Sequence, residues 1–357
     1  MRLKTRVFAL SVALAVFSAP VFAPALAPAL ANEPITINAT ALPVFDRSVP
    51  SNRFGPLTYL GGLSLNSRHS DFEALSGLTM QGDRLIMVTD EGDWVTAALQ
   101  SEIDGTPIGL TDARIGPLLN TDGTPMQSKR LADAEAVTMV GDELWVANER
   151  NQPIRAYDLR DGALTGPARL PLGSQAPLQS SRNAGPEALV HVTAGPLSGQ
   201  TILFLEEQWR SAPLNNAARI GPDGELALFQ IRRLDRFAIT GAAMLPDGDL
   251  VIVERRFSWD DGIFMRLRWL PANEIANGAV EGRILLEADG GSIIDNMEGI
   301  AVTDHPNGPI LTLISDDNGN FFQRTVLLRF QITGDLNDLP VLTPPSPTPR
   351  PVARPAQ

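Results

Sequence analysis

One sequence pattern occurs five times along this chain of 357 residues, and it constrains the fold more than any other feature. Each copy has a short apolar run, a polar turn that contains glycine, and a second apolar run that ends in acidic residues. The copies begin 59, 52, 53 and 58 residues apart, at Ser76, Glu135, Glu187, Thr240 and Glu298. A repeat of this period is typical of a propeller or a solenoid, because one unit cannot bury its apolar face without its neighbours.

Two weaker apolar runs follow in each copy, such as "PIRAYDL" and "LTGPARLPL" in the second. Four antiparallel strands per copy make a propeller blade. The fifth copy supplies only three runs, and an additional apolar run, 55–65, precedes the first copy. We therefore predict an all-β propeller of five four-stranded blades, closed by the N-terminal strand so that no edge stays open. Six blades would require a hidden blade in a segment such as 97–130, which holds only two strand-like runs.

The two ends of the chain differ in composition from the repeats. A basic "MRLKTR", an apolar run and the A-x-A sequences at 25–27 and 29–31 predict a secretory signal peptide over 1–31. We therefore expect a periplasmic or secreted protein with one propeller domain over 32–333. Proline recurs throughout 334–357, which predicts a disordered tail. The chain contains no cysteine, so disulfides and a lipid anchor on cysteine are excluded.

The charge of the chain limits its partners. Signal cleavage removes Arg2, Lys4 and Arg6, which takes the formal net charge from −12 to −15. So acidic a protein is a poor candidate for nucleic acid or anionic membranes and a natural host for cations. We expect a monomer without a membrane span after cleavage, acting on a small molecule. The three histidines lack the spacing of a zinc motif.

Two sets of oxygen-bearing residues are predicted to share one face of the propeller. The first strand of a blade lines the central channel and the second runs antiparallel to it, so the start of one lies near the end of the other. The first strands begin with the ring residues, which are Ser76, Glu135, Glu187, Thr240 and Glu298. The second strands end at acids, which are Asp90, Glu149, Glu206 or Glu207, Glu254 and Asp316.

Three ring carboxylates about 6 Å apart would repel each other by roughly 2.8 kcal/mol per pair at an effective dielectric of 20. Such a ring requires a cation, protonation or arginines. Oxygen donors of variable geometry favour Ca²⁺, so we predict that the five ring residues bind calcium on the axis. The alternative is a wet channel, or pairing of the glutamates with Arg150, Arg210 and Arg255.

Several of these segments resemble the bacterial phytase-like family, which is described by an esterase-like activity. They include "SGLTM", "AEAVTM", "GPEALV", "ITGAAMLPDGDLVIVERRFS", "DNMEGIAV" and "LTLISDDN". The resemblance runs from about Leu57 to Ile332. It implies a β-propeller and an exported protein, and only loosely a reaction.

The order Ser, Glu, Glu, Thr, Glu is also similar to the axial ring of five-bladed calcium-activated nucleotidases (apyrases). In that family one Ca²⁺ lies on the axis beside the nucleotide phosphates. The likeness implies that the ring residues here surround calcium, with Thr240 in place of a serine. Six-bladed propeller phytases instead cluster several calcium ions with Lys and Arg, whereas the predicted mature chain has one lysine, Lys129. Arginines would then have to contact phosphate.

Arginines follow several acids of the second strands, which suits a phosphorylated substrate. Glu149 or Glu254 could act as a general base, and Arg150 and Arg255 could stabilise charge. The candidates for substrate binding are Asp90, Arg210, Arg256 and Asp316. These residues predict a calcium-dependent phosphoester hydrolase.

Three other functions compete with this prediction. A calcium-dependent lactonase or esterase would also use axial calcium. A non-catalytic binding propeller could hold a structural metal, and the arginines could then form local salt bridges at strand ends. A serine esterase is disfavoured, because the chain has no G-x-S-x-G.

Overall fold

The computed structural model describes residues 32–126, 129–150, 152–174, 185–205, 213–320 and 322–341. The predicted signal peptide and the tail from residue 342 lie outside the described residues. Across these described ranges the β-structure is interrupted only by two short helices, α1 (Lys129–Ala132) and α2 (Ala272–Asn277), and by two 3₁₀ turns, η1 (Gly195–Leu197) and η2 (Leu336–Asp338). Within the described residues, no helix is long and apolar enough to cross a membrane.

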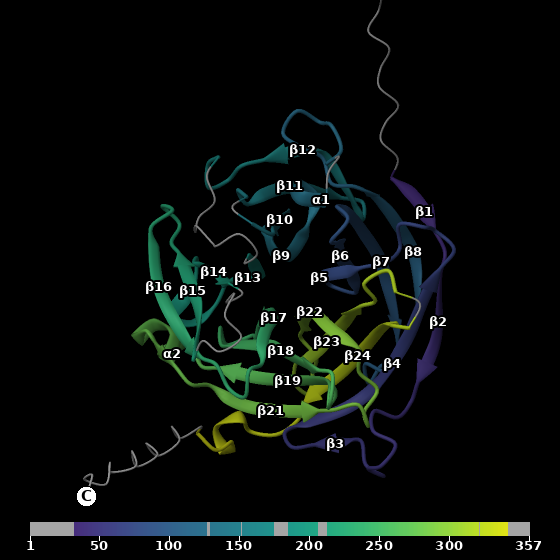
Figure 1. The fold of residues 1–357 in the computed structure, drawn as a ribbon, viewed down its shortest axis with the longest axis vertical. Helices are drawn as coiled ribbons and strands as arrows, with labels where there is room; N and C mark the ends of the chain where they lie inside the picture. The colour runs from purple at the N-terminus through teal and green to yellow at the C-terminus, as the bar shows by residue number, and fades with distance from the viewer. Residues whose placement is uncertain are drawn as a thin grey trace, which may run out of the picture. The chain divides into compact units, whose positions relative to one another are not determined.

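The described chain forms five antiparallel sheets around a common centre, as a five-bladed propeller (Figure 1). From the centre outward, blade 1 contains β5 (Leu75–Gln81), β6 (Arg84–Thr89), β7 (Asp93–Ser101) and β8 (Pro107–Pro117). Blade 2 contains β9 (Ala134–Val140), β10 (Glu143–Asn148), β11 (Arg155–Arg160) and β12 (Ala163–Arg169). Blade 3 contains β13 (Pro186–His191), β14 (Thr201–Leu205), β15 (Leu214–Ile220) and β16 (Leu226–Arg232). Blade 4 contains β17 (Ala238–Met244), β18 (Leu250–Ser258), β19 (Gly262–Leu270) and β21 (Arg283–Ala288). Blade 5 contains β22 (Asn296–Thr303), β23 (Ile310–Asp316), β24 (Thr325–Ile332) and β4 (Leu57–Ser67). The prediction of five blades is therefore confirmed, and 97–130 contributes strands to blade 1.

The ring closes as the sequence predicts. β4 pairs antiparallel with β24, from Leu57 opposite Ile332 to Leu65 opposite Thr325. The chain before β4 adds contacts that the sequence does not predict. β1 (Glu33–Ile35) pairs with β8 at the outer edge of blade 1, and β2 (Ile37–Leu42) pairs with β4 in blade 5, where β3 (Arg53–Phe54) also pairs. One short N-terminal segment thus spans the joint between the last blade and the first.

The hydrophobic core is divided into five clusters, one at each joint between adjacent blades. Both faces of a blade are covered by its neighbours, so alternate residues of a strand enter different clusters. In β10, Leu144 packs in the joint with blade 1 and Ala147 in the joint with blade 3. This arrangement explains why the inner strands read as continuous apolar runs.

Two outer features complete the sheets and the core. β20 (Ala279–Val280) pairs parallel to β16 at the edge of blade 3. Leu336, the first residue of η2, and Leu339, which follows η2, pack against the cluster between blades 4 and 5. Part of the segment from residue 334, which the sequence assigns to the tail, thus contacts the core.

Candidate metal centre and its surrounding face

Each innermost strand contains a β-bulge, and in all five blades the bulge falls on the predicted ring residue. In blade 1, Leu75 pairs with Thr89 and Gly77 pairs with Val88, so the ladder skips Ser76. The same shift skips the other ring residues, Glu135, Glu187, Thr240 and Glu298. A bulge leaves one residue unpaired and re-aims its side chain, and bulges of this kind are common beside functional sites. The fold therefore orients the same position in every blade independently of turn length.

The five ring residues line one narrow cavity at the centre of the propeller. Its volume is about 10 Å³, close to the room needed for one water molecule or one metal ion. Close backbone packing fixes this width: a Cβ atom at Gly241 would overlap the carbonyl oxygen of Glu298. The structure thus brings the ring residues together, while their role as metal ligands stays a prediction.

The two ring hydroxyls connect neighbouring blades. Ser76 Oγ donates a hydrogen bond to the carbonyl oxygen of Ala134, the residue before Glu135. Thr240 Oγ1 donates to the carbonyl oxygen of Met297, the residue before Glu298, at 2.9 Å. Each hydroxyl therefore holds the backbone beside a ring glutamate of the next blade. Its oxygen lone pairs remain available to a cation, since the proton points elsewhere.

Arg255 is the cation that reaches the ring most directly. Its Nη1 atom lies 3.2 Å from Glu298 Oε1 and also contacts Asn296 Oδ1. Asn296 Nδ2 donates to Glu298 Oε1 at 2.8 Å and to Asp316 Oδ2 at 3.2 Å. The arginine pairing considered as the alternative to a metal is thus present at Glu298.

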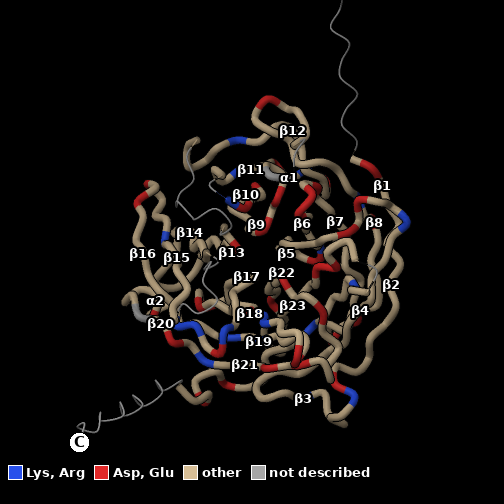
Figure 2. The backbone as a smooth tube through the Cα atoms, viewed as in Figure 1, with Lys and Arg blue, Asp and Glu red and all other residues tan. Residues whose placement is uncertain are grey.

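Crowding of carboxylates raises pKa values around the ring. Burial raises the pKa of Glu135 well above its usual value, and repulsion from Glu187 and Glu298 adds to the effect. Burial, followed by repulsion from Glu298, raises the pKa of Asp316 to about 8. Asp90 contributes to both shifts, so it lies beside the same cluster. Figure 2 shows Asp and Glu positions beside the inner strands β5, β9 and β22.

The donor set fits a hard cation, but the side chains do not already form its coordination shell. All five ring residues offer oxygen. Among the described residues in and beside the ring, carboxylates outnumber arginines. Yet among the described residues no three His, Asp or Glu side chains are close enough together to hold a metal ion as they stand. Binding would therefore draw Glu298 away from Arg255 and towards the other glutamates.

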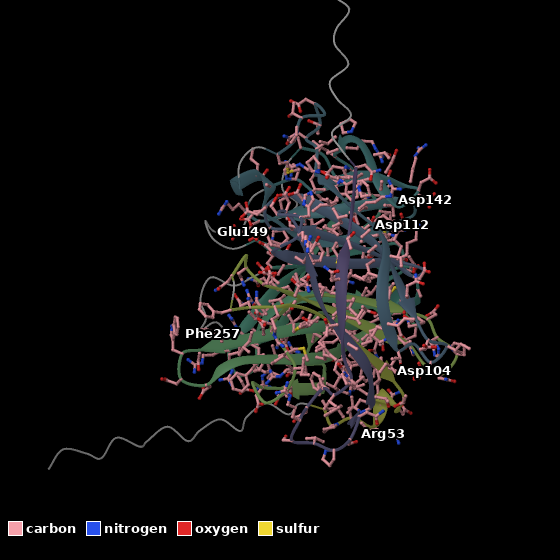
Figure 3. All side chains as sticks on the ribbon, turned by 90° about the vertical axis from the view of Figure 1, so that its right-hand side faces the viewer. Arg53, Asp104, Asp112, Asp142, Glu149 and Phe257 are labelled. Atoms are coloured by element: carbon pink, nitrogen blue, oxygen red, sulfur yellow. The ribbon has the colours of Figure 1, made fainter. Side chains whose placement is uncertain are left out.

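Blade 2 contributes a second acidic pair to this face. Figure 3 shows Glu149 and Phe257 on one side of the propeller and Asp104 and Asp142 on the other. Glu149 pairs with Arg150 at 3.1 Å, and Arg150 Nη2 also lies 3.7 Å from Asp133. Burial, followed by a hydrogen bond that the protonated carboxyl of Asp133 donates to Glu149, raises the pKa of Asp133 to about 7. The local salt bridge expected as the alternative for Arg150 is thus present, although Glu149 stays partly exposed.

The structure contradicts the general-base role predicted for Glu254. The side chain is fully buried, and its Oε1 accepts a hydrogen bond from Arg268 Nη2 at 2.6 Å. Arg268 is also fully buried and donates to the carbonyl oxygens of Arg232 and Glu281. The reason is strand length: β18 runs on to Ser258, so Glu254 lies within the strand rather than at its end. No substrate can reach a carboxylate enclosed in this way.

Arg256, which the sequence predicts as a substrate-binding residue, has its own partners away from the ring. Its guanidinium stacks on the ring of Phe264, 4.0 Å from the centroid, and lies 3.9 Å from Asp261. It lines a separate cavity with Phe237, because Arg255 and Arg256 project from opposite faces of β18. Glu206, Glu207 and Arg210 lie outside the described residues.

Sequence reasoning missed two polar neighbours of the ring, Asp133 and Asn296. Each stands two residues before a ring glutamate, Glu135 or Glu298. Side chains two residues apart in a strand share a face, so this spacing was the available signal.

Comparison with known proteins gives one family match. The model of the phytase-like family, described as "esterase-like activity of phytase", matches residues 70–319. No curated protein matches the chain significantly.

Two solved structures illustrate more distant likenesses. A gluconolactonase from Xanthomonas campestris is 14% identical with a TM-score of 0.40, covering 88% of this chain and 99% of its own. A PQQ-bound aldose sugar dehydrogenase from Streptomyces coelicolor is 11% identical with a TM-score of 0.42, covering 84% and 99%. These low scores and different reactions assign no function. The family match covers well over half of the sequence, and the chain therefore belongs to the phytase-like family.

Proposed function

We propose that this protein is an exported, calcium-dependent hydrolase of phosphate esters. The observation that carries the proposal is the ring of five oxygen-bearing residues, each aimed by its own bulge at one axial cavity. The family description, which names an esterase-like activity of phytase, supports hydrolysis.

Ser76, Glu135, Glu187, Thr240 and Glu298 would hold the calcium ion. When bound, calcium supplies a Lewis acid that polarises a phosphoryl oxygen and makes water more acidic. Glu149 would accept the proton of the attacking water, since its carboxylate lies on the acidic face and is 19% exposed. Asp90 and Asp316 would orient the substrate through water or hydroxyl groups.

Arg255 would change partners during binding. In the structure it neutralises Glu298, and its side chain is 37% exposed. With Glu298 holding a cation, the guanidinium of Arg255 would lose its hold on this carboxylate and would contact the substrate phosphate. Arg255 would thus weaken calcium binding and strengthen phosphate binding.

This exchange of partners predicts that Arg255→Gln strengthens calcium binding and weakens the reaction with phosphate esters. We expect calcium to bind several-fold more tightly by titration calorimetry, because the competing cation is gone. We expect kcat/KM for a phosphate ester to fall roughly tenfold to a hundredfold, the value of one charge-assisted hydrogen bond of about 1.5–3 kcal/mol. Arg160→Ala, at the end of β11, serves as the control, since Arg160 is 73% exposed and its ion pair is with Asp158 on the same strand. Unchanged calcium affinity in Arg255→Gln would contradict the exchange.

Calcium should also stabilise the fold. A ligand that binds only the folded protein adds RT ln(1 + [L]/Kd), or about 2.7 kcal/mol at 100 times Kd. For a domain of about 300 residues this raises Tm by about 4 °C. We expect EDTA to reverse the shift and Glu187→Gln to remove most of it, while Glu225→Gln, in an exposed turn, keeps it. A Tm that changes neither with calcium nor with EDTA would favour a ring that pairs with arginine and binds no metal.

The direct test is hydrolysis with and without calcium, over phosphomonoesters, nucleotides, phytate and lactones. Calcium-dependent release of phosphate supports the proposal. Turnover of lactones alone would identify the lactonase instead. Calcium binding without turnover of any class would indicate a binding propeller with a structural metal.

A further inference from the structure

A second, larger cavity opens on the acidic face over blade 5. Its volume is about 530 Å³, which is within the range of small-molecule sites. One wall is the end of β4 with the loop that leads to β5, and the other is the loop between β23 and β24. We call it the blade 5 cavity.

The inner wall of the blade 5 cavity is built from residues that stand close in sequence to the inner strands of blades 1 and 5. Asp317 directly follows Asp316, and Glu73 stands three residues before Ser76. The two walls are joined where the backbone N–H of Ala74 donates to Asp317 Oδ1 at 2.9 Å. Burial and then repulsion from Asp317 raise the pKa of Glu73, so these carboxylates are close. A ligand in the cavity would therefore reach towards the axis.

The lining is unusually polar for a cavity of this size. Leu65 and Phe72 are its only apolar side chains, and both are buried. The rest of the lining consists of glycine, hydroxyl, amide, imidazole and charged groups. Apolar ligands would gain little here, whereas a ligand with many hydroxyl groups could exchange hydrogen bonds throughout.

The charges of the cavity are arranged by sign. Glu73 and Asp317 stand on the wall towards the ring, where they can accept hydrogen bonds from ligand hydroxyls. Arg68 and Arg324 also line the cavity. Among the described residues Arg68 is exposed and has no ion-pair partner, and Arg324 lies 3.9 Å from Asp295 with half its side chain exposed. These two guanidinium groups can therefore take a ligand anion without breaking a strong internal pair.

We propose that the blade 5 cavity binds the organic part of the substrate, a polyhydroxylated group with an anionic substituent that Arg68 and Arg324 contact. The inference rests on the proposed function, in which the phosphate to be cleaved lies at the ring. The anion can be a carboxylate or a second phosphate, because both accept hydrogen bonds from arginine.

Four probes separate these features. 6-Phosphogluconate carries hydroxyls and a carboxylate, fructose 1,6-bisphosphate carries a second phosphate, and sorbitol 6-phosphate has hydroxyls without a second anion. p-Nitrophenyl phosphate has none of them. We expect wild-type kcat/KM to be highest for one of the first two, which identifies the anion, and lowest for p-nitrophenyl phosphate.

Arg68→Ala should raise KM for the preferred probe roughly tenfold and leave p-nitrophenyl phosphate within twofold. Arg324→Ala should act in the same direction, and Arg160→Ala should change neither. An unchanged KM in Arg68→Ala for both probes that carry a second anionic group, with normal turnover of p-nitrophenyl phosphate, overturns the cavity proposal and leaves the proposed function intact.

If no probe is hydrolysed, the proposed function fails, and the cavity proposal is then tested by binding measurements alone. Titration calorimetry would then compare 6-phosphogluconate and fructose 1,6-bisphosphate on the wild type and on Arg68→Ala. A tenfold weaker Kd in the variant supports the cavity. Equal binding, or none to the wild type, overturns it.

Discussion

Glutamine at position 135 or 298 is expected to abolish calcium-dependent turnover while leaving the protein folded. The substitution keeps the shape of the side chain and removes one of three converging carboxylates. Without calcium, Glu135→Gln should be as stable as the wild type or more stable, because Glu135 is repelled by Glu187 and Glu298. The Tm response to calcium should disappear together with activity. A variant that keeps its stability without calcium but loses its Tm response to calcium has lost the site. A misfolded variant would lose stability without calcium as well.

Two matched glutamates serve as controls for this experiment. Glu225→Gln alters an exposed turn and should change neither stability nor turnover. Glu254→Gln should lower stability by about 3–5 kcal/mol, because it leaves the buried Arg268 without its partner. The calcium response of its folded fraction should persist. Normal turnover in Glu135→Gln and Glu298→Gln would contradict the role of the ring.

The ring residues and the closure of the propeller could be predicted because both follow from the repeat. Five copies in register specify five equivalent positions, and a fifth copy with three strands requires a fourth strand from elsewhere. The bulges that aim the ring could not be predicted, since a one-residue shift leaves no mark in a pattern of apolar runs. β1 and β2 were also missed, because short edge strands carry little periodicity.

The errors at the second strands have one physical cause. The sequence places Glu149 and Glu254 at equal distances from the start of their copies, but β10 ends at Asn148 and β18 runs to Ser258. The longer strand encloses Glu254 beside Arg268 and turns Arg255 towards Glu298. Arg255, which the sequence places after Glu254 at the rim, is thus a direct partner of the ring residue Glu298. Strand length is decided by pairing with β19, which the local sequence does not reveal.

Removal of residues 32–66 is expected to prevent folding. The deletion takes away β1 to β3 and nearly all of β4, and with them the partner of β24 along its whole length. It also removes Leu57, Tyr59, Leu63 and Leu65 from the clusters on both sides of blade 5. Burial of one large apolar side chain contributes about 1.5–3 kcal/mol, so four approach the whole stability of a typical domain.

The chain that begins at Asn32 is the matched control for this deletion and should fold cooperatively, with its melting followed by circular dichroism. The shorter chain should be insoluble or lack a melting transition, because β24 presents an open edge to other molecules. Adding residues 32–66 as a separate peptide should restore solubility, since the lost strand pairs through backbone hydrogen bonds that need no covalent connection. A soluble shorter chain with a cooperative transition of its own would show that four blades and an incomplete fifth suffice, and that closure by β4 is dispensable.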